Sequence, residues 1–433
     1  MSDTIFALSS GRPPAGIAVI RISGQLSFYI NGLFANNDDP PLRVAQLRTL
    51  RKPGSGDILD QVLVLGFRGP HSATGEDVIE WHCHGGQAVV RAILDALHGQ
   101  TADMDLREAQ PGEFTRRAFE NGRIDLNEAE GLADLLSAET ETQRRSALLM
   151  AEGHFSRRLD GWRTDLLRCA ALTESLLDFS DEDDVPDEGA VGELKSSLCR
   201  LGDDMQAQLA APSAERLNDG IRVVLAGPPN AGKSTLLNAL AGRDAAIVSD
   251  IAGTTRDRID VPVSLNGIAF TLTDTAGLNE KSEDRIEQIG IDRARVAIDQ
   301  ADILLWLGAP SDCPREDAVR VSAQMDRVDW QADGGTDLAV SAVTGENMDK
   351  LVDLLCEQAS HLIPAEGSYA LHARQRESVS RMKAEIAQAL TQDDLLIVAE
   401  HLRMALGEMD RLVGRAGVED MLDTLFGRFC IGK

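Results

Sequence analysis

Closely spaced cysteine pairs, long apolar runs and an excess of basic residues are all missing from this chain. The six cysteines are scattered without a C-x-x-C pair, which suits a reducing compartment better than a disulfide framework. No apolar run approaches the roughly 20 residues that a membrane-spanning helix needs. No basic stretch precedes the first apolar residues, as it would in a signal peptide. The sequence therefore predicts a cytoplasmic protein with no membrane partner.

Basic residues are scarce: lysine and arginine total 43 against 70 aspartates and glutamates, for a formal net charge of -27. A broad basic surface that grips nucleic acid is not predicted, because phosphate contacts need clustered cations. If RNA is the substrate, a more basic partner is expected to hold much of it. Plain solubility explains the acidity equally well.

The order of sequence patterns over the 433 residues predicts two or three domains of α/β and α type. Residues 1–120 mix strand-like runs with a helical stretch at 88–97. Helical spacing follows from 127 to 179, ends in an acidic segment and resumes at 191–209. Residues 219–362 then alternate strands with helices, as in a mostly parallel sheet with crossover helices. The strand-like runs of the first part lie at 16–22, 61–67 and 77–83.

The helical pattern returns after Pro364 and continues almost to the end of the chain. A single amphipathic helix is marginal alone, so the helices before Asn218 are expected to pack on those after Pro364. The α/β unit is then an insertion into one helical domain. Such an insertion is possible because the two ends of a domain often lie close together. The predicted parts are an α+β domain at 1–120, a helical domain at 121–215 and 364–433, and the inserted domain at 216–363.

The strongest motif is G-x-x-x-x-G-K-S at residues 227–234, between an apolar strand and a helix. Gly227 and Gly232 let backbone N–H groups wrap phosphates at a helix N-terminus. Lys233 is predicted to reach the β- and γ-phosphates, and the Ser234 hydroxyl to ligate Mg²⁺. A chance glycine-rich turn is the alternative, and both flanking elements count against it. Further predicted nucleotide contacts in this loop are Asn230, Ala231 and Thr235.

Two downstream segments complete a predicted GTPase phosphate site. Asp274 ends an apolar strand, where its carboxylate can orient a Mg²⁺-bound water, and the Gly277 N–H can sense the γ-phosphate. Thr255 offers a hydroxyl as a second Mg²⁺ ligand. Thr275 and Ala276, which lie between Asp274 and Gly277, are further predicted nucleotide contacts. Three such segments in this order favour a guanine-nucleotide switch.

Base recognition is predicted at Asp326-Arg327-Val328-Asp329, the closest match to N-K-x-D. The Asp329 carboxylate is expected to accept hydrogen bonds from the guanine N1–H and 2-amino groups, which adenine lacks. Asp326 and Arg327 replace Asn and Lys, so weaker affinity for the base is expected. No strand is evident at 308–323, and a surface loop that happens to contain Asp remains the alternative. Ser341 and Ala342 match the loop that closes over the base and favour GTP over ATP.

The hydrolytic step needs a group that neutralises transition-state charge. Leu278 follows Gly277, so the water-orienting glutamine of Ras-like proteins is absent. Either a partner's arginine or a cation must act instead. Asn230 offers a side-chain carbonyl beside the phosphates, as in GTPases that hold K⁺ there, although it could equally be a turn residue.

Other motifs lie at residues 3–5, 16–24, 74–86, 111–123, 247–257 and 429–433. In this order, and together with the P-loop, they resemble the MnmE (TrmE) family of tRNA-modification GTPases over the whole chain. The resemblance implies a homodimer formed through the N-terminal domain, which binds 5-formyl- or methylene-tetrahydrofolate as a one-carbon source. The residues that match the family's folate contacts are Arg21, Glu80, Arg123 and Lys433. Arg123 stands where the family commonly has Lys, which keeps the charge but changes its geometry.

The resemblance also implies a potassium site and a catalytic acid. K⁺ would be held by Asn230, Ser249, Thr254 and the backbone carbonyl of Ile251, and the G domains would dimerise across it. Glu287 matches the acidic residue that orients the attacking water. The implied catalytic residues are thus Glu287, Lys233 and Asn230.

The implied partner is a FAD-bearing protein of the MnmG type, in a heterotetramer or larger complex that modifies C5 of the wobble uridine of certain tRNAs. FAD would belong to that partner, because no G-x-G-x-x-G follows a strand here. A potassium-type GTPase of ribosome assembly is the alternative enzyme, although neither a KH-like G-x-x-G loop nor a basic patch is evident. A folate-binding scaffold with a decayed G domain is the non-enzymatic alternative.

Overall fold

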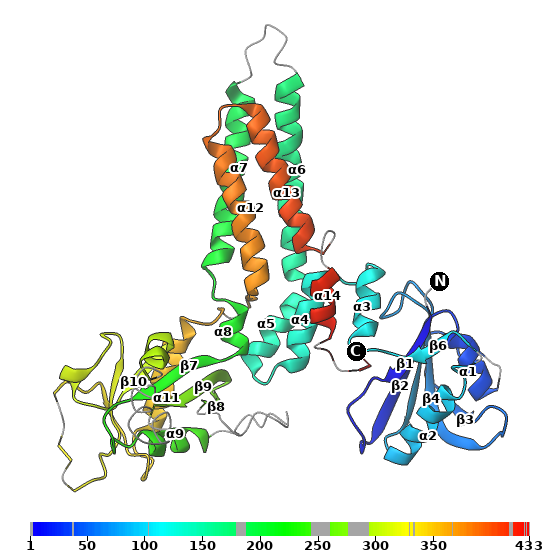
Figure 1. Ribbon diagram of the computed structural model, residues 1–433, viewed down its shortest axis with the longest axis horizontal. Coiled ribbons are helices and arrows are strands. Elements are labelled where there is room, and N and C mark those ends of the chain that lie inside the picture. Colours follow the sequence, from blue (N-terminus) through cyan, green and yellow to red (C-terminus); the bar gives the residue numbers. More distant parts are fainter. Residues whose placement is uncertain are drawn as a thin grey trace, which may run out of the picture. The chain divides into compact units, whose positions relative to one another are not determined.

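The computed structural model forms two compact units, Met1–Ala133 with Asp410–Lys433, and Asp134–Met409 (Figure 1). It describes residues 3–36, 39–102, 104–178, 188–243, 260–275, 294–328, 330–331, 334–365, 367–414, 419–427, 429 and 431–432. The predicted α/β and α fold class is confirmed, with a mostly parallel sheet set among helices. The predicted boundaries of the four segments stay a prediction.

The first unit holds a mixed sheet in the order β3-β4-β5-β2-β1-β6. Only the β1–β6 pair among these described strands is parallel. Helices α1 and α2 pack on one face, where the tilted rings of Trp81 and Phe34 have their centroids 5.2 Å apart and Trp81 Nε1 donates to Asn31 Oδ1 at 3.0 Å. The elements are β1 (Thr4–Leu8), β2 (Ile17–Ser23), α1 (Ser27–Ala35), β3 (Gln46–Arg51), β4 (Ile58–Phe67), β5 (Val78–His84), α2 (Gln87–His98) and β6 (Leu106–Glu108).

Strand alternation separates the two faces of this sheet. Ile20 and Ile22 of β2 are buried against the helices, so Arg21 between them points to the opposite face. In β5 the same alternation buries Ile79 and Trp81 and turns Glu80 outward. The three strand-like runs and the helix predicted here are confirmed as β2, β4, β5 and α2.

The end of the chain returns to this first unit. Helices α3 (Glu113–Glu120) and α14 (Glu419–Phe426) join through the Arg116–Asp423 ion pair at 2.8 Å and a small apolar cluster. Pro111 pairs with Ile431, and a Cβ added at Gly432 would lie 2.0 Å from the Leu8 carbonyl. Only glycine therefore fits the chain end against β1.

The second unit contains long helices that run side by side (Figure 1). Arg376 of α12 donates to the carbonyls of Leu209 and Ala211, at the C-terminal end of α7, at 2.5 and 2.8 Å. His401 of α13 bonds Glu385 of α12 at 2.7 Å. The prediction that helices before and after the inserted sheet pack together is confirmed. The elements are α4 (Leu126–Ser137), which ends in this unit, α5 (Glu141–Ala151), α6 (His154–Asp178), α7 (Glu188–Ala210), α8 (Ala214–Asn218), α12 (Ala373–Thr391) and α13 (Leu395–Leu412).

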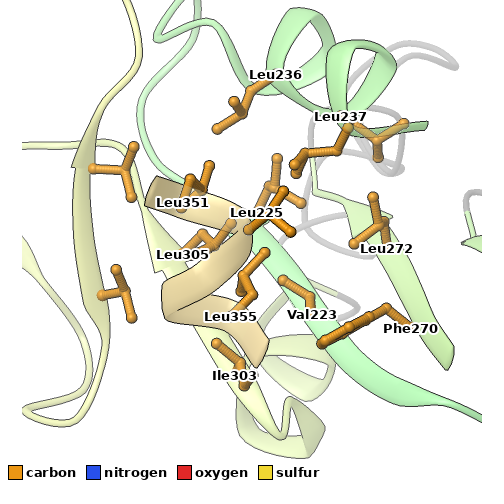
Figure 2. Close-up of a cluster of buried hydrophobic side chains, with 14 of the residues drawn as sticks. Val223, Leu225, Leu236, Leu237, Phe270, Leu272, Ile303, Leu305, Leu351 and Leu355 are labelled. Atoms are coloured by element: carbon orange, nitrogen blue, oxygen red, sulfur yellow. The ribbon is translucent and has the colours of Figure 1, made fainter. Parts of the chain in front are cut away.

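The inserted sheet has the order β12-β11-β10-β7-β9-β8, with β8 antiparallel to the others. Helices α9 and α11 lie over one face, where Leu236, Leu351 and Leu355 meet Leu225 and Leu305 (Figure 2). Since β7 pairs in parallel on both sides, all of its residues but the exposed Arg222 are apolar and buried. The elements are β7 (Ile221–Ala226), α9 (Lys233–Ala241), β8 (Asp260–Leu265), β9 (Ile268–Asp274), β10 (Ile303–Trp306), β11 (Val319–Ser322), β12 (Leu338–Ala339) and α11 (Met348–Ser360).

The expectation that residues 308–323 lack a strand is wrong. Strand β11 (Val319–Ser322) lies there and pairs in parallel with β10 and β12. Val319 and Val321 are buried while Arg320 between them is partly exposed, so the alternation is real but only four residues long. Residues 307–318, all described, reach it through a 3-10 turn (Pro310–Asp312) and not an α-helix.

No helix in the described part of the chain is long and apolar enough to cross a membrane.

Candidate nucleotide-binding site

The loop between β7 and α9 adopts backbone angles that its glycines permit. Gly232 has φ of 92° directly before α9, and Gly227 has φ of 150°. A Cβ on Gly227 would lie 2.9 Å from the backbone carbon of Leu307. Asn230 is also left-handed, with φ of 63°, a region that asparagine tolerates better than most residues. The loop thus leads directly into the N-terminus of α9, which is an anion-binding position.

Lys233 lies at the start of α9 and folds back over the loop. Its Nζ donates to the carbonyls of Gly227 at 2.9 Å and Pro228 at 2.8 Å. Burial lowers the pKa of Lys233, and the nearby Asp274 carboxylate opposes that shift. The ammonium is therefore held at the phosphate loop at a desolvation cost that a bound anion would offset.

Ser234, in the first turn of α9, and Asp274, at the end of β9, come together. The Ser234 hydroxyl donates to Asp274 Oδ2, and Asp274 ends β9 opposite Leu225 of β7. Thr275 donates from its hydroxyl to the Leu225 carbonyl at 2.9 Å, which fixes the chain beyond β9. A hydroxyl beside a carboxylate is an oxygen pair that suits Mg²⁺ when nucleotide phosphates and water complete the shell. Ala231 and Thr235 flank these groups on the same loop and helix.

The loop after β11 contacts both the phosphate loop and the Ser-Ala loop. Ser341, fully buried, donates from Oγ to Asp326 Oδ1 at 2.7 Å and accepts from the Thr344 N–H at 3.0 Å. Gln324 donates from Nε2 to the Asn230 carbonyl at 2.9 Å. Ala342 is half-buried beside the inserted core. A cavity of about 450 Å³ lies between the phosphate loop and the β11 loop, and its lining includes Asn230, Ala231, Gln324, Arg327 and Trp330.

The first unit carries a second group of predicted residues. Arg21 pairs with Glu80 across β2 and β5, with Nε and Nη2 at 2.9 and 2.8 Å from Oε1. His82 Nε2 lies 3.3 Å from Glu80 Oε2. Arg123 is exposed, and its Cγ would lie 3.2 Å from a Cβ added at Gly75. The structure thus brings Arg21 and Glu80 into contact and sets Arg123 beside the segment at 74–86.

Sequence reasoning missed the charged network that supports this unit. Arg117, nearly buried, contacts Asp3 at 2.7 Å, Glu113 at 3.0 Å and Glu76 at 3.1 Å. A buried arginine with three carboxylates fixes α3 against the strand ends. The signal available in the sequence was the arginine pair at 116–117, together with the glutamates in the motifs at 74–86 and 111–123.

The remaining predicted site residues lie outside the described part of the chain. They are Ser249, Ile251, Thr254, Thr255, Ala276, Gly277, Glu287, Asp329 and Lys433.

A mostly parallel sheet whose first strand ends in G-x-x-x-x-G-K-S, with a lysine, a serine and an aspartate converging there, defines a P-loop nucleotide-binding protein.

Comparison with known proteins specifies the family. The family model described as "GTP-binding protein TrmE N-terminus" matches residues 4–123, and "MnmE helical domain" matches residues 126–430. The tRNA modification GTPase MnmE of Rhizorhabdus wittichii is 56% identical over 435 residues, covering 100% of this chain and 97% of that protein. The protein of the same name from Erythrobacter litoralis is 53% identical over 431 residues, covering 100% of both chains. The G domain of the T. maritima FeoB iron transporter is 24% identical and covers 32% of this chain and 98% of that domain, but its TM-score of 0.24 is too low to support an argument.

The chain belongs to the MnmE family of tRNA modification GTPases. It is a GTPase that acts in tRNA modification, so the ribosome-assembly and decayed-scaffold alternatives are set aside.

Proposed function

We propose that this GTPase depends on K⁺ and works with a FAD-containing partner of the MnmG type. Together they modify C5 of the wobble uridine in certain tRNAs, with a one-carbon unit from a bound 5-formyl- or methylene-tetrahydrofolate. The observation that carries the proposal is the phosphate site, in which Lys233, Ser234 and Asp274 converge beside the left-handed Asn230.

The described residues would divide the work on GTP between them. Lys233 would bind the β- and γ-phosphates, exchanging its two loop carbonyls for charged oxygens. The Ser234 hydroxyl would turn from Asp274 toward Mg²⁺, while Asp274 orients a metal-bound water. A bound Mg²⁺ supplies charge neutralisation at the phosphates. Thr255 and Gly277 are proposed to complete this site.

Asn230 is proposed as the described ligand of K⁺. The Gln324 side chain donates to the backbone carbonyl of Asn230, which has a left-handed φ of 63°. The Asn230 side chain is exposed on the phosphate loop, where its own carbonyl would face a cation beside bound phosphates. A cation there would neutralise the charge that an arginine finger neutralises elsewhere. The other proposed ligands are Ser249, Ile251 and Thr254, with Glu287 orienting the attacking water.

The outward face of the N-terminal sheet supports a folate site. Glu80 can accept two hydrogen bonds from the amino and ring N–H groups of a pterin, while Arg21 holds one of its carboxylate oxygens. Arg123 and Lys433 are proposed to contact the same ligand, and Arg123 can pair bidentately with the glutamate tail of the folate. The close fit of Gly432 against Leu8 supports the assignment for Lys433.

Exposed apolar side chains support the proposed homodimer. Leu47 of β3 and Leu63 of β4 are paired across the strands and are 67% and 41% exposed. Ile58 at the start of β4 is 62% exposed. Apolar groups gathered on neighbouring strands at a sheet edge mark a protein interface more often than a solvated surface. A second copy of the N-terminal domain is the proposed occupant, and the MnmG-type protein would join the dimer in a heterotetramer or larger complex.

The test is the GTP hydrolysis rate in KCl against NaCl at equal ionic strength, with Mg²⁺ present. We expect strong stimulation by K⁺, and loss of that stimulation in Asn230→Ala. Asn266→Ala is the matched control, because Asn266 is also exposed and left-handed, with φ of 50°, but lies in the β8–β9 turn. Equal rates in both salts would contradict the potassium proposal and point to a partner's arginine.

A further inference from the structure

The polypeptide leaves β11 at the edge of the sheet where nucleotide-binding groups gather. Strand β7 ends at the phosphate loop and β9 ends at Asp274. Since β11 runs parallel to β10 and β10 to β7, its carboxyl end lies at the same edge. Residues 323–326 follow β11 directly, so this tetrapeptide occupies the position of a base-reading loop.

Three backbone contacts fix the register of this loop. The Met325 N–H donates to the Val340 carbonyl at 3.2 Å, and Gln324 forms an antiparallel bridge with Ser341. The Val340 N–H donates to the Ser322 carbonyl at 2.8 Å. The loop after β11 and the Ser-Ala loop therefore form one small ladder, and a shift of register would break it.

We propose that Asp326, rather than Asp329, is the carboxylate that selects guanine, and that Gln324 occupies the lysine position of N-K-x-D. The tetrapeptide Ala323-Gln324-Met325-Asp326 then stands for that motif, without its asparagine amide and without its positive charge. This inference rests on the GTPase activity and not on the proposed potassium or folate sites.

Asp326 has the placement that base selection requires. Its Oδ1 accepts from the buried Ser341 hydroxyl at 2.7 Å, which orients the carboxylate, yet Asp326 itself is exposed. A carboxylate can accept about four hydrogen bonds. The bond to Ser341 therefore leaves capacity for both the N1–H and the 2-amino group of guanine.

Gln324 joins the base loop to the phosphate loop through a neutral bond. Its Nε2 donates to the Asn230 carbonyl at 2.9 Å, and its Oε1 accepts from Arg327 at 2.9 Å. The same side chain lies against Gly232, whose added Cβ would be 3.3 Å from Nε2. A lysine here would make a charge-assisted bond to the same carbonyl, which is stronger than an amide bond. The hydrogen bond that joins the base loop to the phosphate loop is therefore weaker here than a lysine at this position would make it.

The test is a specificity switch between GTP and xanthosine triphosphate (XTP), whose C2 carbonyl replaces the 2-amino group of guanine. Asp326→Asn keeps an acceptor for Ser341 but presents an amide N–H₂ to that carbonyl. We expect GTP to bind about 100-fold more weakly, from the loss of two charged hydrogen bonds, and XTP to bind better than GTP. Asp329→Asn is the matched control and is expected to keep the wild-type preference for GTP.

Two outcomes of these binding measurements contradict the proposal. If Asp329→Asn switches to XTP while Asp326→Asn keeps GTP, Asp329 reads the base. If neither variant changes preference, the loop does not select guanine at all. If Asp326→Asn does not fold, Asp326→Glu is measured instead, and an undiminished GTP affinity in that variant would refute the role of Asp326.

The Gln324 half of the proposal has its own measurement. Gln324→Lys is expected to raise GTP affinity several-fold without changing the ratio of GTP to XTP binding, because the lysine strengthens the loop and not the selection. Gln331→Lys, which also lies in the lining of the cavity but carries no bond to Asn230, controls for the added charge. Equal effects of the two substitutions would overturn the assignment for Gln324.

Discussion

Burial and charge act in opposite directions at Lys233. The side chain is nearly buried at the helix start, which lowers the pKa of its ammonium, while Asp274 favours the charged form. A bound triphosphate would place several negative charges against the same ammonium and raise its pKa. Nucleotide binding and protonation of Lys233 are therefore linked.

The sign of that linkage gives a prediction for pH. Because the bound state has the higher pKa, it holds the proton more tightly than the free state does. Affinity for a non-hydrolysable GTP analogue is therefore expected to be highest at pH values below the lowered pKa of Lys233 in the free protein. It should fall as the pH rises through and above that pKa. A fluorescence titration from pH 7 to 10 measures this. Lys233→Arg does not titrate in that range, so any dependence it retains belongs to the nucleotide. An identical fall in both proteins would contradict the linkage.

The site residues that the sequence could predict were those whose positions are fixed by the backbone of a short local segment. Gly227, Gly232, Lys233 and Ser234 lie within one short loop, whose geometry follows from its glycines and from the helix that begins there. The pairing of Ser234 with Asp274 was also predictable, since Asp274 ends a strand parallel to β7 and Ser234 begins the helix that follows β7. Asp326 depends instead on where β11 ends.

Elements differ in how much of their structure the sequence encodes locally. Strand β7 has five buried apolar residues, interrupted only by Arg222, and is recognisable alone. Strand β11 has four residues with only two buried, and its pairing with β10 and β12 defines it. The helical run predicted at 127–179 likewise divides into α4, α5 and α6. There Thr140 caps α5 and Gln143 returns the bond, in a capping box that apolar spacing does not record.

The edge of the N-terminal sheet yields a prediction about assembly. Leu47→Asp places a charge among the exposed apolar side chains of β3 and β4, and is expected to convert the proposed dimer to monomer. Because Leu47 is exposed within the chain, the substitution should change monomer stability by no more than about 1 kcal/mol. Sedimentation equilibrium measures the assembly state. Leu167→Asp, an exposed leucine on α6 at 44%, is the control and should leave assembly unchanged. A dimer that survives Leu47→Asp would move the interface elsewhere.

Within the second unit, the inserted sheet is attached to the helices at a narrow junction. Ser213 pairs with Leu371, and the Ala214 N–H donates to the Leu371 carbonyl at 3.0 Å, so the chain enters and leaves the insertion side by side. Helix α5 adds the bonds from Gln143 to the carbonyls of Leu217 and Asn218 at 3.0 and 3.3 Å. One further bond, from Thr142 to the Gly267 carbonyl at 3.1 Å, reaches the β8–β9 turn itself. The insertion was predictable from the order of patterns, but this junction was not, because its contacts join residues far apart in sequence.

Separate cores on either side of that junction predict that the two parts fold independently. The apolar core of the inserted sheet runs from Ile221 to Ala359, while the helices bury their own leucines and methionines. Replacing residues 219–362 by a short flexible linker keeps the bonds from Gln143 and the Ser213–Leu371 pair, so the remaining chain should stay helical and unfold cooperatively. Circular dichroism during heating tests the shortened protein, and nucleotide titration tests the isolated segment at 216–363, which should bind GTP. A shortened protein that loses its cooperative transition would mean that the helices depend on the inserted sheet, and that nucleotide state and helix packing share one folding unit.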